Sequence, residues 1–177
     1  MSGQEKIVQL YSAAQVRQRL DELAHFVNAD YRGQEVLLLS VLNGARKITD
    51  ELAARMRVPI DISCVTATSY EDNTEPQKRV EVRLDTGVRV AGRHVLLVDD
   101  IADTGCTLSA VAERVTREGP RSLKTFVLTN KPQRRIVRVP LDYVAFAVPN
   151  RFIVGFGMGL GERFRDLPFL GYLKESG

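Results

Sequence analysis

The stretch Val95-Leu-Leu-Val-Asp-Asp-Ile-Ala-Asp-Thr-Gly-Cys-Thr-Leu108 is the most informative part of the sequence for the fold. It begins as a continuous apolar run, which is typical of a strand buried on both faces of a parallel sheet. The run ends in two acids, and a short turn then leads into an amphipathic helix closed by Gly119-Pro120. A buried strand followed directly by a helix is the repeating unit of α/β folds.

The same alternation extends to both sides of this stretch. Further strands are predicted at residues 35–42, 60–69, 79–84, 124–129, 142–148 and 152–154, beside the one at 94–98. Helices are predicted behind a capping box at Ser12–Gln15 and around Ile48, Leu52 and Met56. The sequence therefore predicts an α/β fold with a central, mainly parallel sheet flanked by helices.

In such sheets, ligands bind beyond the carboxyl ends of the strands. Four groups of residues follow apolar strands here: Asn43-Gly44, Ser69-Tyr70, the segment 99–107 and Lys131. All four groups are polar or permit unusual backbone conformations. We therefore expect one site assembled from four strand ends.

Thr104-Gly105-Cys106-Thr107 has the properties of a phosphate-binding loop. It lies at a predicted helix N-terminus, where free backbone N–H groups and the helix dipole favour an anion. Gly105 allows close backbone approach, and the threonines add hydroxyl donors. It is not a Walker A loop, because Gly-x-x-x-x-Gly-Lys is absent.

Three acids precede this loop. Asp99 and Asp100 can accept hydrogen bonds from sugar hydroxyls or hold Mg²⁺, and Asp103 can take a proton. The alternative is that Asp103 only caps the helix and the Asp pair only ends the strand. Three acids followed by Thr-Gly-x-Thr favour the functional interpretation.

Length and composition set further limits. The 177 residues, 44% hydrophobic and 27% charged, fit a single globular domain spanning 1–177. No apolar run approaches the roughly 20 residues of a membrane span, and no signal peptide is evident. Two cysteines and two histidines fit neither a disulfide framework nor a histidine-rich metal site. We expect a cytoplasmic protein.

Basic residues are concentrated between positions 113 and 138. The eight are Arg114, Arg117, Arg121, Lys124, Lys131, Arg134, Arg135 and Arg138. Such a cluster could attract RNA or a small polyphosphate, or it could be a solvated surface without a partner. No RNA-binding motif with interleaved aromatic residues accompanies it, so nucleic acid is not the expected partner.

The segment 95–108 resembles the phosphoribosyl-pyrophosphate signature of type I phosphoribosyltransferases. The segments 130–135, 139–146, 149–158 and 163–171 resemble the bacterial hypoxanthine–guanine branch of that family. The likeness extends from about residue 11 to residue 173. It implies the type I phosphoribosyltransferase fold, with a small hood formed by the terminal segments.

The resemblance also implies a reaction. A 6-oxopurine displaces pyrophosphate from C1′ of phosphoribosyl pyrophosphate, with Mg²⁺, giving IMP or GMP. Residues 104–107 would bind the 5′-phosphate, Asp99 and Asp100 the ribose hydroxyls and the metal, and Asp103 would be the general base or acid. In base binding, Lys131 would contact the 6-oxo group, Phe152 would stack on the purine, and Ile153 and Gly159 would offer backbone groups.

Pyrophosphate would be bound by Asn43, Gly44 and Arg165, and Ser69-Tyr70 would begin a mobile loop. The sequence departs from the family at two positions: Asp99 replaces a glutamate, and Gly159 replaces an aspartate that helps hold a second Mg²⁺. By resemblance we also expect a homodimer or homotetramer. Two alternatives stay open: an RNA-binding regulator on the same fold, and an enzyme that prefers xanthine.

Overall fold

The computed structural model describes residues 6–42, 44–70 and 79–174. Its centre is a six-stranded sheet in the order β4-β3-β2-β5-β6-β7. These strands are β2 (Val36–Leu42), β3 (Ile60–Tyr70), β4 (Arg79–Leu84), β5 (His94–Ala102), β6 (Ser122–Asn130) and β7 (Tyr143–Ala147). All neighbours pair in parallel except β3 and β4, which confirms the predicted α/β fold with a mainly parallel sheet.

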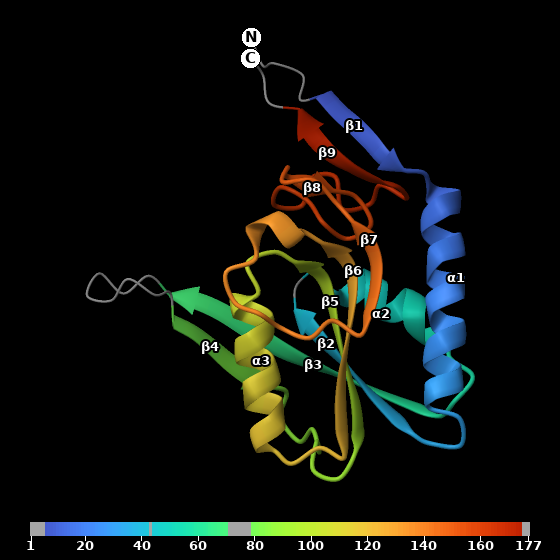
Figure 1. Ribbon diagram of the computed structural model, residues 1–177, viewed down its shortest axis with the longest axis vertical. Coiled ribbons are helices and arrows are strands. Elements are labelled where there is room, and N and C mark those ends of the chain that lie inside the picture. The colour runs from blue at the N-terminus through green and yellow to red at the C-terminus, as the bar shows by residue number, and fades with distance from the viewer. Residues whose placement is uncertain (1–5, 43, 71–78, 175–177) are drawn as a thin grey trace.

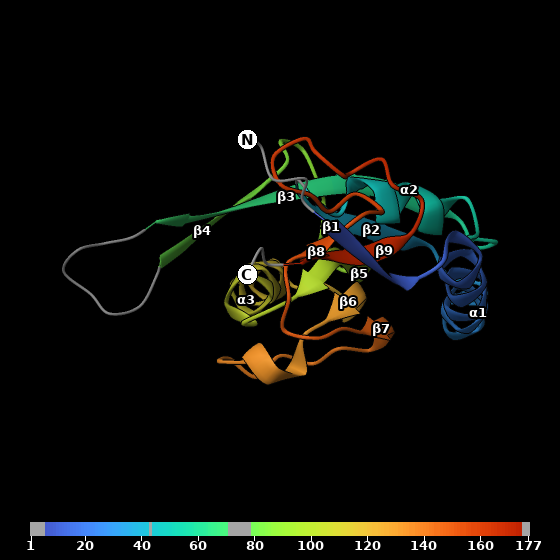
Figure 2. The same cartoon turned by 90° about the horizontal axis from the view of Figure 1, so that it is seen from above.

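Helices cover both faces of this sheet. Viewed from above, α3 (Cys106–Arg117) lies on one side, and α1 (Ala13–Asp30) and α2 (Arg46–Ala53) lie on the other (Figure 2). Val36–Val41 of β2 and Val95–Val98 of β5 are almost completely buried between these layers. Their almost entirely apolar sequence, with Ser40 as the polar exception, is explained by this burial on both faces.

A second, smaller sheet forms the predicted hood. It contains β1 (Lys6–Tyr11), β9 (Leu170–Lys174) and β8 (Ile153–Val154), in that order, and lies above the carboxyl ends of the central strands (Figure 1). The sequence analysis predicted only β8 as a strand. β1 and β9 are short and only partly buried, so the residues of each strand carry little periodic signal by themselves.

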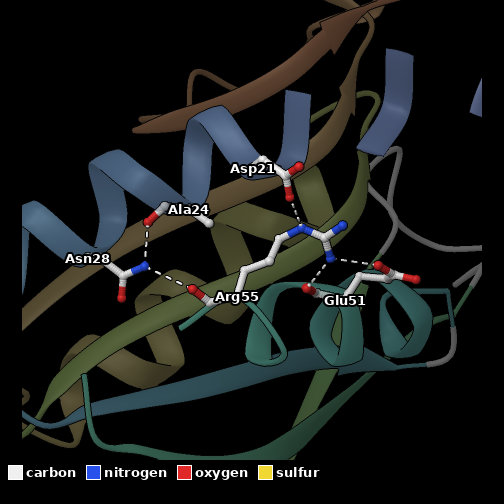
Figure 3. A network of polar contacts seen from close by, with 5 residues as sticks. All are labelled: Asp21, Ala24, Asn28, Glu51 and Arg55. Atoms are coloured by element: carbon white, nitrogen blue, oxygen red, sulfur yellow. Dashed lines mark hydrogen bonds and ion pairs between the residues drawn. The ribbon is translucent and has the colours of Figure 1, made fainter. Parts of the chain in front are cut away.

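A polar network fixes α1 against the end of α2 (Figure 3). The Arg55 guanidinium contacts Asp21 Oδ1 on α1 at 2.6 Å and the Glu51 carboxylate on α2 at 2.6 Å. Asn28 Nδ2 donates to the backbone oxygens of Ala24 and Arg55, at 2.8 and 3.0 Å. Because α2 begins two residues after Gly44, this network helps hold the segment that enters the candidate site.

Several boundaries differ from the predicted ones by one or two residues, and those of β5 and α2 differ by more. β5 continues to Ala102, so Asp99 and Asp100 lie within the strand, paired with β6, and do not follow it. Met56 lies beyond α2, which ends at Ala53. The Ser12 capping box is confirmed: Ser12 Oγ accepts from the Gln15 backbone N–H at 3.2 Å, and Gln15 Oε1 accepts from the Ser12 N–H at 2.8 Å.

Candidate active site

The carboxyl ends of β2 and β5 and the start of α3 surround a cavity of about 290 Å³. Its lining contains Gly44, the segment 99–105 and Thr107, together with apolar residues of β2 and α3. The structure therefore brings together two of the four predicted strand ends on one cavity wall. We call this space the acid cavity, after Asp99, Asp100 and Asp103.

The Thr104–Thr107 loop has the geometry expected of an anion-binding turn. Gly105 adopts φ +87° and caps α3, which begins at Cys106. A Cβ atom at Gly105 would lie 2.3 Å from the carbonyl oxygen of Val137, so the position requires glycine for space as well as for conformation. Backbone N–H groups at the start of α3 and both threonine hydroxyls suit a phosphate. Within the loop, the Cys106 N–H donates to Thr104 Oγ1 at 3.4 Å.

A segment after β6 supports this loop, which the sequence analysis did not foresee. The backbone N–H groups of Ile136 and Val137 both donate to the Thr104 carbonyl oxygen, at 2.8 and 3.0 Å. Arg135 donates to Ala102 O and Asn130 Oδ1 from behind the loop. No local pattern signals the contacts to Ala102 and Thr104, because those partners are about 30 residues apart in the sequence.

Asp99 and Asp100 form a buried acidic pair. Only 7% of Asp99 is exposed, and its Oδ1 accepts the Asp100 backbone N–H at 2.9 Å. Burial and the neighbouring Asp100 carboxylate hold the pKa of Asp99 well above its usual range. Burial also raises the pKa of Asp100, although the Arg165 charge acts in the opposite direction.

The Asp100 carboxylate lies directly against Gly44. A Cβ atom at Gly44 would lie 1.7 Å from Asp100 Oδ2, so glycine is needed here for close approach. The carbonyl oxygen of Asp100 accepts from Thr129 Oγ1 at 3.0 Å, which ties β5 to β6. These contacts fix Asp100 where β2, β5 and β6 meet.

The acid pair fits Mg²⁺. Within the described ranges, no three His, Cys, Asp or Glu side chains form a cluster suited to a metal ion. Mg²⁺, however, is commonly held by one or two carboxylates, with water and substrate phosphates completing the shell. Burial disfavours the negative charge of these two carboxylates, so they are suitable ligands for a cation that arrives bound to the substrate.

Asp103 and Lys131 also come together, as the sequence analysis expected. Asp103 Oδ2 lies 3.7 Å from Lys131 Nζ, and its Oδ1 lies 2.7 Å from Arg134 Nε. Lys131 is only 7% exposed, and this burial lowers its pKa, whereas the Asp103 charge opposes that shift. The sequence analysis had placed Arg134 only in the basic cluster.

The predicted base-binding residues of the hood lie outside the acid-cavity wall. Phe152 is 48% exposed, which is unusual for a large aromatic side chain, whereas its neighbour Ile153 is buried in β8. An exposed aromatic ring suits stacking on a flat ligand. Asn43 lies outside the described residues, as do 71–78, and Ser69 and Tyr70 are placed only as the end of β3.

Arg165 lines a second cavity of about 450 Å³, which shares Gly44 with the acid cavity and also contains Lys47 and Gly157. Its Nε donates to Gly161 O at 2.6 Å and its Nη1 to Gly157 O at 2.9 Å. We call this space the arginine cavity. The predicted pyrophosphate residues Gly44 and Arg165 thus share one cavity wall.

Gly159 is confined by its surroundings. A Cβ atom there would lie 2.1 Å from the Arg163 carbonyl oxygen and 3.0 Å from Arg165 Cγ. The nearby Glu162 does not replace the missing carboxylate, because its side chain is 97% exposed. The turn is therefore built for glycine at this position.

Comparisons with known proteins agree with this geometry. Residues 7–159 match the family model described as the phosphoribosyl transferase domain. The chain belongs to this family. It is 35% identical to a hypoxanthine-guanine phosphoribosyltransferase of Streptococcus agalactiae, over 94% of the chain and 93% of that protein.

Other relatives of this phosphoribosyltransferase differ in length. A Listeria innocua relative, the bifunctional protein TilS/HprT, is 34% identical over 94% of the chain, but the chain spans only 26% of that protein. Among solved structures, a hypoxanthine-guanine phosphoribosyltransferase from Bacillus anthracis superposes with a TM-score of 0.88. It is 31% identical, and the match covers 97% of the chain and 99% of that structure.

Most of the basic cluster of this phosphoribosyltransferase is engaged in ion pairs. Arg114 pairs with Glu118, Arg117 with Glu113 at 4.0 Å, and Lys124 with Asp30 at 2.8 Å. Lys131 and Arg134 both pair with Asp103. This internal pairing weakens the case for an RNA-binding surface.

Adding the family's carboxylate at Gly159 is expected to harm the enzyme, although the sequence alone favours the opposite result. Gly159→Asp should raise the KM for phosphoribosyl pyrophosphate several-fold, because the new Cβ displaces the Arg163 carbonyl or the Arg165 side chain. Initial rates titrated against free Mg²⁺ and against phosphoribosyl pyrophosphate measure this. A lower Mg²⁺ requirement with an unchanged KM would show that the turn accepts the side chain.

Asp99→Asn is expected to stabilise the protein in the absence of divalent metal ions and to abolish turnover. Because burial and Asp100 raise the pKa of folded Asp99, its contribution to stability is full below the unfolded pKa and is lost as pH rises through the folded pKa. Removing the charge should raise the free energy of unfolding by about 0.5–2 kcal/mol at neutral pH, a typical gain at strained functional sites. Melting temperatures in EDTA across pH 4–8 test this, and parallel curves for both proteins would contradict it.

Proposed function

We propose that this phosphoribosyltransferase transfers the 5-phosphoribosyl group from phosphoribosyl pyrophosphate to hypoxanthine or guanine, giving IMP or GMP and pyrophosphate. The observation that carries the proposal is the buried Lys131, held 3.7 Å from Asp103 beside the phosphate loop. The shared domain and the hypoxanthine-guanine phosphoribosyltransferases among its relatives support it. The reaction is that of a purine-salvage transferase.

In the proposed reaction, the bond from C1′ to the pyrophosphate oxygen breaks and a bond from C1′ to a purine ring nitrogen forms. The Thr104–Thr107 loop would hold the 5′-phosphate and so fix the ribose in place. Asp103 would accept or return the proton of the purine at N7, acting as general base or acid. Mg²⁺ held by Asp99 and Asp100 would neutralise charge on the departing pyrophosphate.

Base choice would come from Lys131 and Phe152. An ammonium group donates hydrogen bonds and accepts none, so it favours a purine with an oxygen at C6 over adenine, which carries an amino group there. The half-exposed Phe152 ring would stack on the purine, and the backbone at Ile153 and Gly159 would meet its edge. Asn43, Gly44 and Arg165 would bind pyrophosphate, and the loop that begins at Ser69-Tyr70 would close over the site.

We also propose that residues 1–177 act as one catalytic domain, as a homodimer or homotetramer, in the cytoplasm. Cys64 and Cys106 are both free thiols, which agrees with a reducing compartment. No helix in the described part of the chain is both long and apolar enough to cross a membrane. Light scattering coupled to gel filtration measures the oligomeric state.

A panel of bases tests the function. Purified protein is mixed with phosphoribosyl pyrophosphate and Mg²⁺, and hypoxanthine, guanine, xanthine or adenine is added while ultraviolet absorbance is followed. Turnover of hypoxanthine or guanine supports the proposal, and turnover of xanthine alone replaces it with the xanthine-preferring alternative. No turnover, together with salt-sensitive RNA binding, would favour a regulatory role.

A further inference from the structure

The arginine cavity contains a cation that the proposed roles leave unassigned. Lys47 is the second residue of α2, and its side chain lines this cavity together with Gly44, Gly157 and Arg165. The cavity adjoins the acid cavity at Gly44. A diphosphate bound between Gly44 and Arg165 would therefore lie in the same space as Lys47.

The other basic side chains of the arginine cavity are already engaged. Arg46 is 73% exposed and pairs with Asp50 at 3.7 Å. Arg165 is held by the Gly157 and Gly161 carbonyl oxygens. Within the described residues Lys47 has no carboxylate in ion-pair distance. Three acids share the lining: Asp50 and Glu51 pair with Arg46 and Arg55, and Asp166 is exposed to solvent.

The turn opposite Lys47 holds its side chain in place. The Lys47 ammonium lies 5.0 Å from the centre of the buried Phe156 ring, and a Cβ atom at Gly157 would lie 3.2 Å from Lys47 Cβ. Phe156 has φ +51°, a costly conformation for a non-glycine residue, between Gly155 at +95° and Gly157 at +99°. Such strain is often found at ligand-binding sites, and here it places an aromatic face against a half-buried ammonium.

We propose that Lys47 is a further diphosphate-binding residue, donating to the diphosphate of phosphoribosyl pyrophosphate and to the released pyrophosphate. The inference rests on the proposed function and extends it by one residue. A diphosphate carries several negative charges, and a compact ammonium suits it.

The test measures pyrophosphate binding directly, by calorimetry on the whole protein with Mg²⁺ present. Lys47→Met keeps most of the aliphatic stem that packs under Gly157 and removes the charge. We expect it to weaken pyrophosphate binding at least about 10-fold, as for loss of a charge-assisted hydrogen bond. Lys47→Arg should stay within about 3-fold of wild type, because the charge is kept.

Arg46→Met is the matched control, since it removes the adjacent cation of the same helix, one that points to solvent and Asp50. It should leave pyrophosphate binding nearly unchanged. In kinetics, Lys47→Met should raise the KM for phosphoribosyl pyrophosphate while the KM for the purine stays constant. A purely structural role would lower the melting temperature without this selectivity.

Equal pyrophosphate affinity of wild type, Lys47→Met and Arg46→Met would overturn the inference. If the variants do not fold, acetylation of the wild-type protein with and without pyrophosphate provides the test. Pyrophosphate should protect Lys47 from acetylation and should not protect Lys6. Equal labelling of Lys47 in both conditions would overturn the proposal. The proposed function is tested separately, by wild-type turnover of the bases. If the wild-type protein turns over the bases and Lys47→Met binds pyrophosphate as tightly as wild type, only the proposed role of Lys47 is wrong.

Discussion

Asp103→Asn is expected to lower kcat with hypoxanthine about 10²–10⁴-fold, the range typical of a lost general acid–base group. Asn keeps the size and shape of the side chain, but it cannot take up a proton at neutral pH. The phosphate loop and the Asp99–Asp100 pair are untouched by the change. Binding of phosphoribosyl pyrophosphate, measured by calorimetry, should therefore stay within a few-fold of wild type.

Asp85→Asn is a suitable control, because this exposed acid follows β4 and lines neither the acid cavity nor the arginine cavity. Its kcat should equal that of wild type. Arg134→Gln adds a second comparison, since it removes the 2.7 Å partner of Asp103 and keeps the carboxylate. An unchanged kcat in Asp103→Asn would show that this residue takes no part in proton transfer and has only a structural role in the loop.

The sequence predicts the acid cavity well because its parts are local. The buried strand, the acids and the Thr-Gly-x-Thr turn follow one another within 95–108, and the hydrophobic pattern and turn residues of that segment predict their order along the chain. The extension of β5 through Asp99 and Asp100 was missed, because polar residues in a strand look like its end. Pairing with β6 keeps them in the sheet.

The support of the site was not predictable in the same way. The Thr104 carbonyl is held by Ile136 and Val137, and the Asp103 carboxylate by Arg134, from a segment about 30 residues later. In the sequence, Arg134 is one of eight cations in a basic run, and nothing distinguishes it from Arg138. Likewise, the confinement of Gly159 by the Arg163 carbonyl depends on a turn whose conformation only the fold reveals.

Lys131→Ala is expected to lower kcat/KM for hypoxanthine about 10–150-fold, corresponding to the roughly 1.5–3 kcal/mol of a hydrogen bond from a charged donor. Lys131 is buried beside Asp103, so water replaces its ammonium poorly in the closed site. The Kd for phosphoribosyl pyrophosphate should change little, because residues 104–107 bind the 5′-phosphate without Lys131. Steady-state kinetics with hypoxanthine, combined with calorimetry for phosphoribosyl pyrophosphate, separates the two effects.

The same substitution should change base preference as well as rate. Without the ammonium, the site no longer donates a hydrogen bond to an acceptor at C6 of the purine. The ratio of adenine to hypoxanthine turnover should therefore rise, even as both rates stay low. Arg138→Ala, an exposed cation of the same segment, should leave both the rate and the ratio unchanged. Loss of Lys131 also leaves Arg134 as the only ion-pair partner of Asp103 among the described residues. A fall in rate without a change in the ratio of adenine to hypoxanthine turnover would therefore mean that Lys131 positions Asp103 and does not select the base.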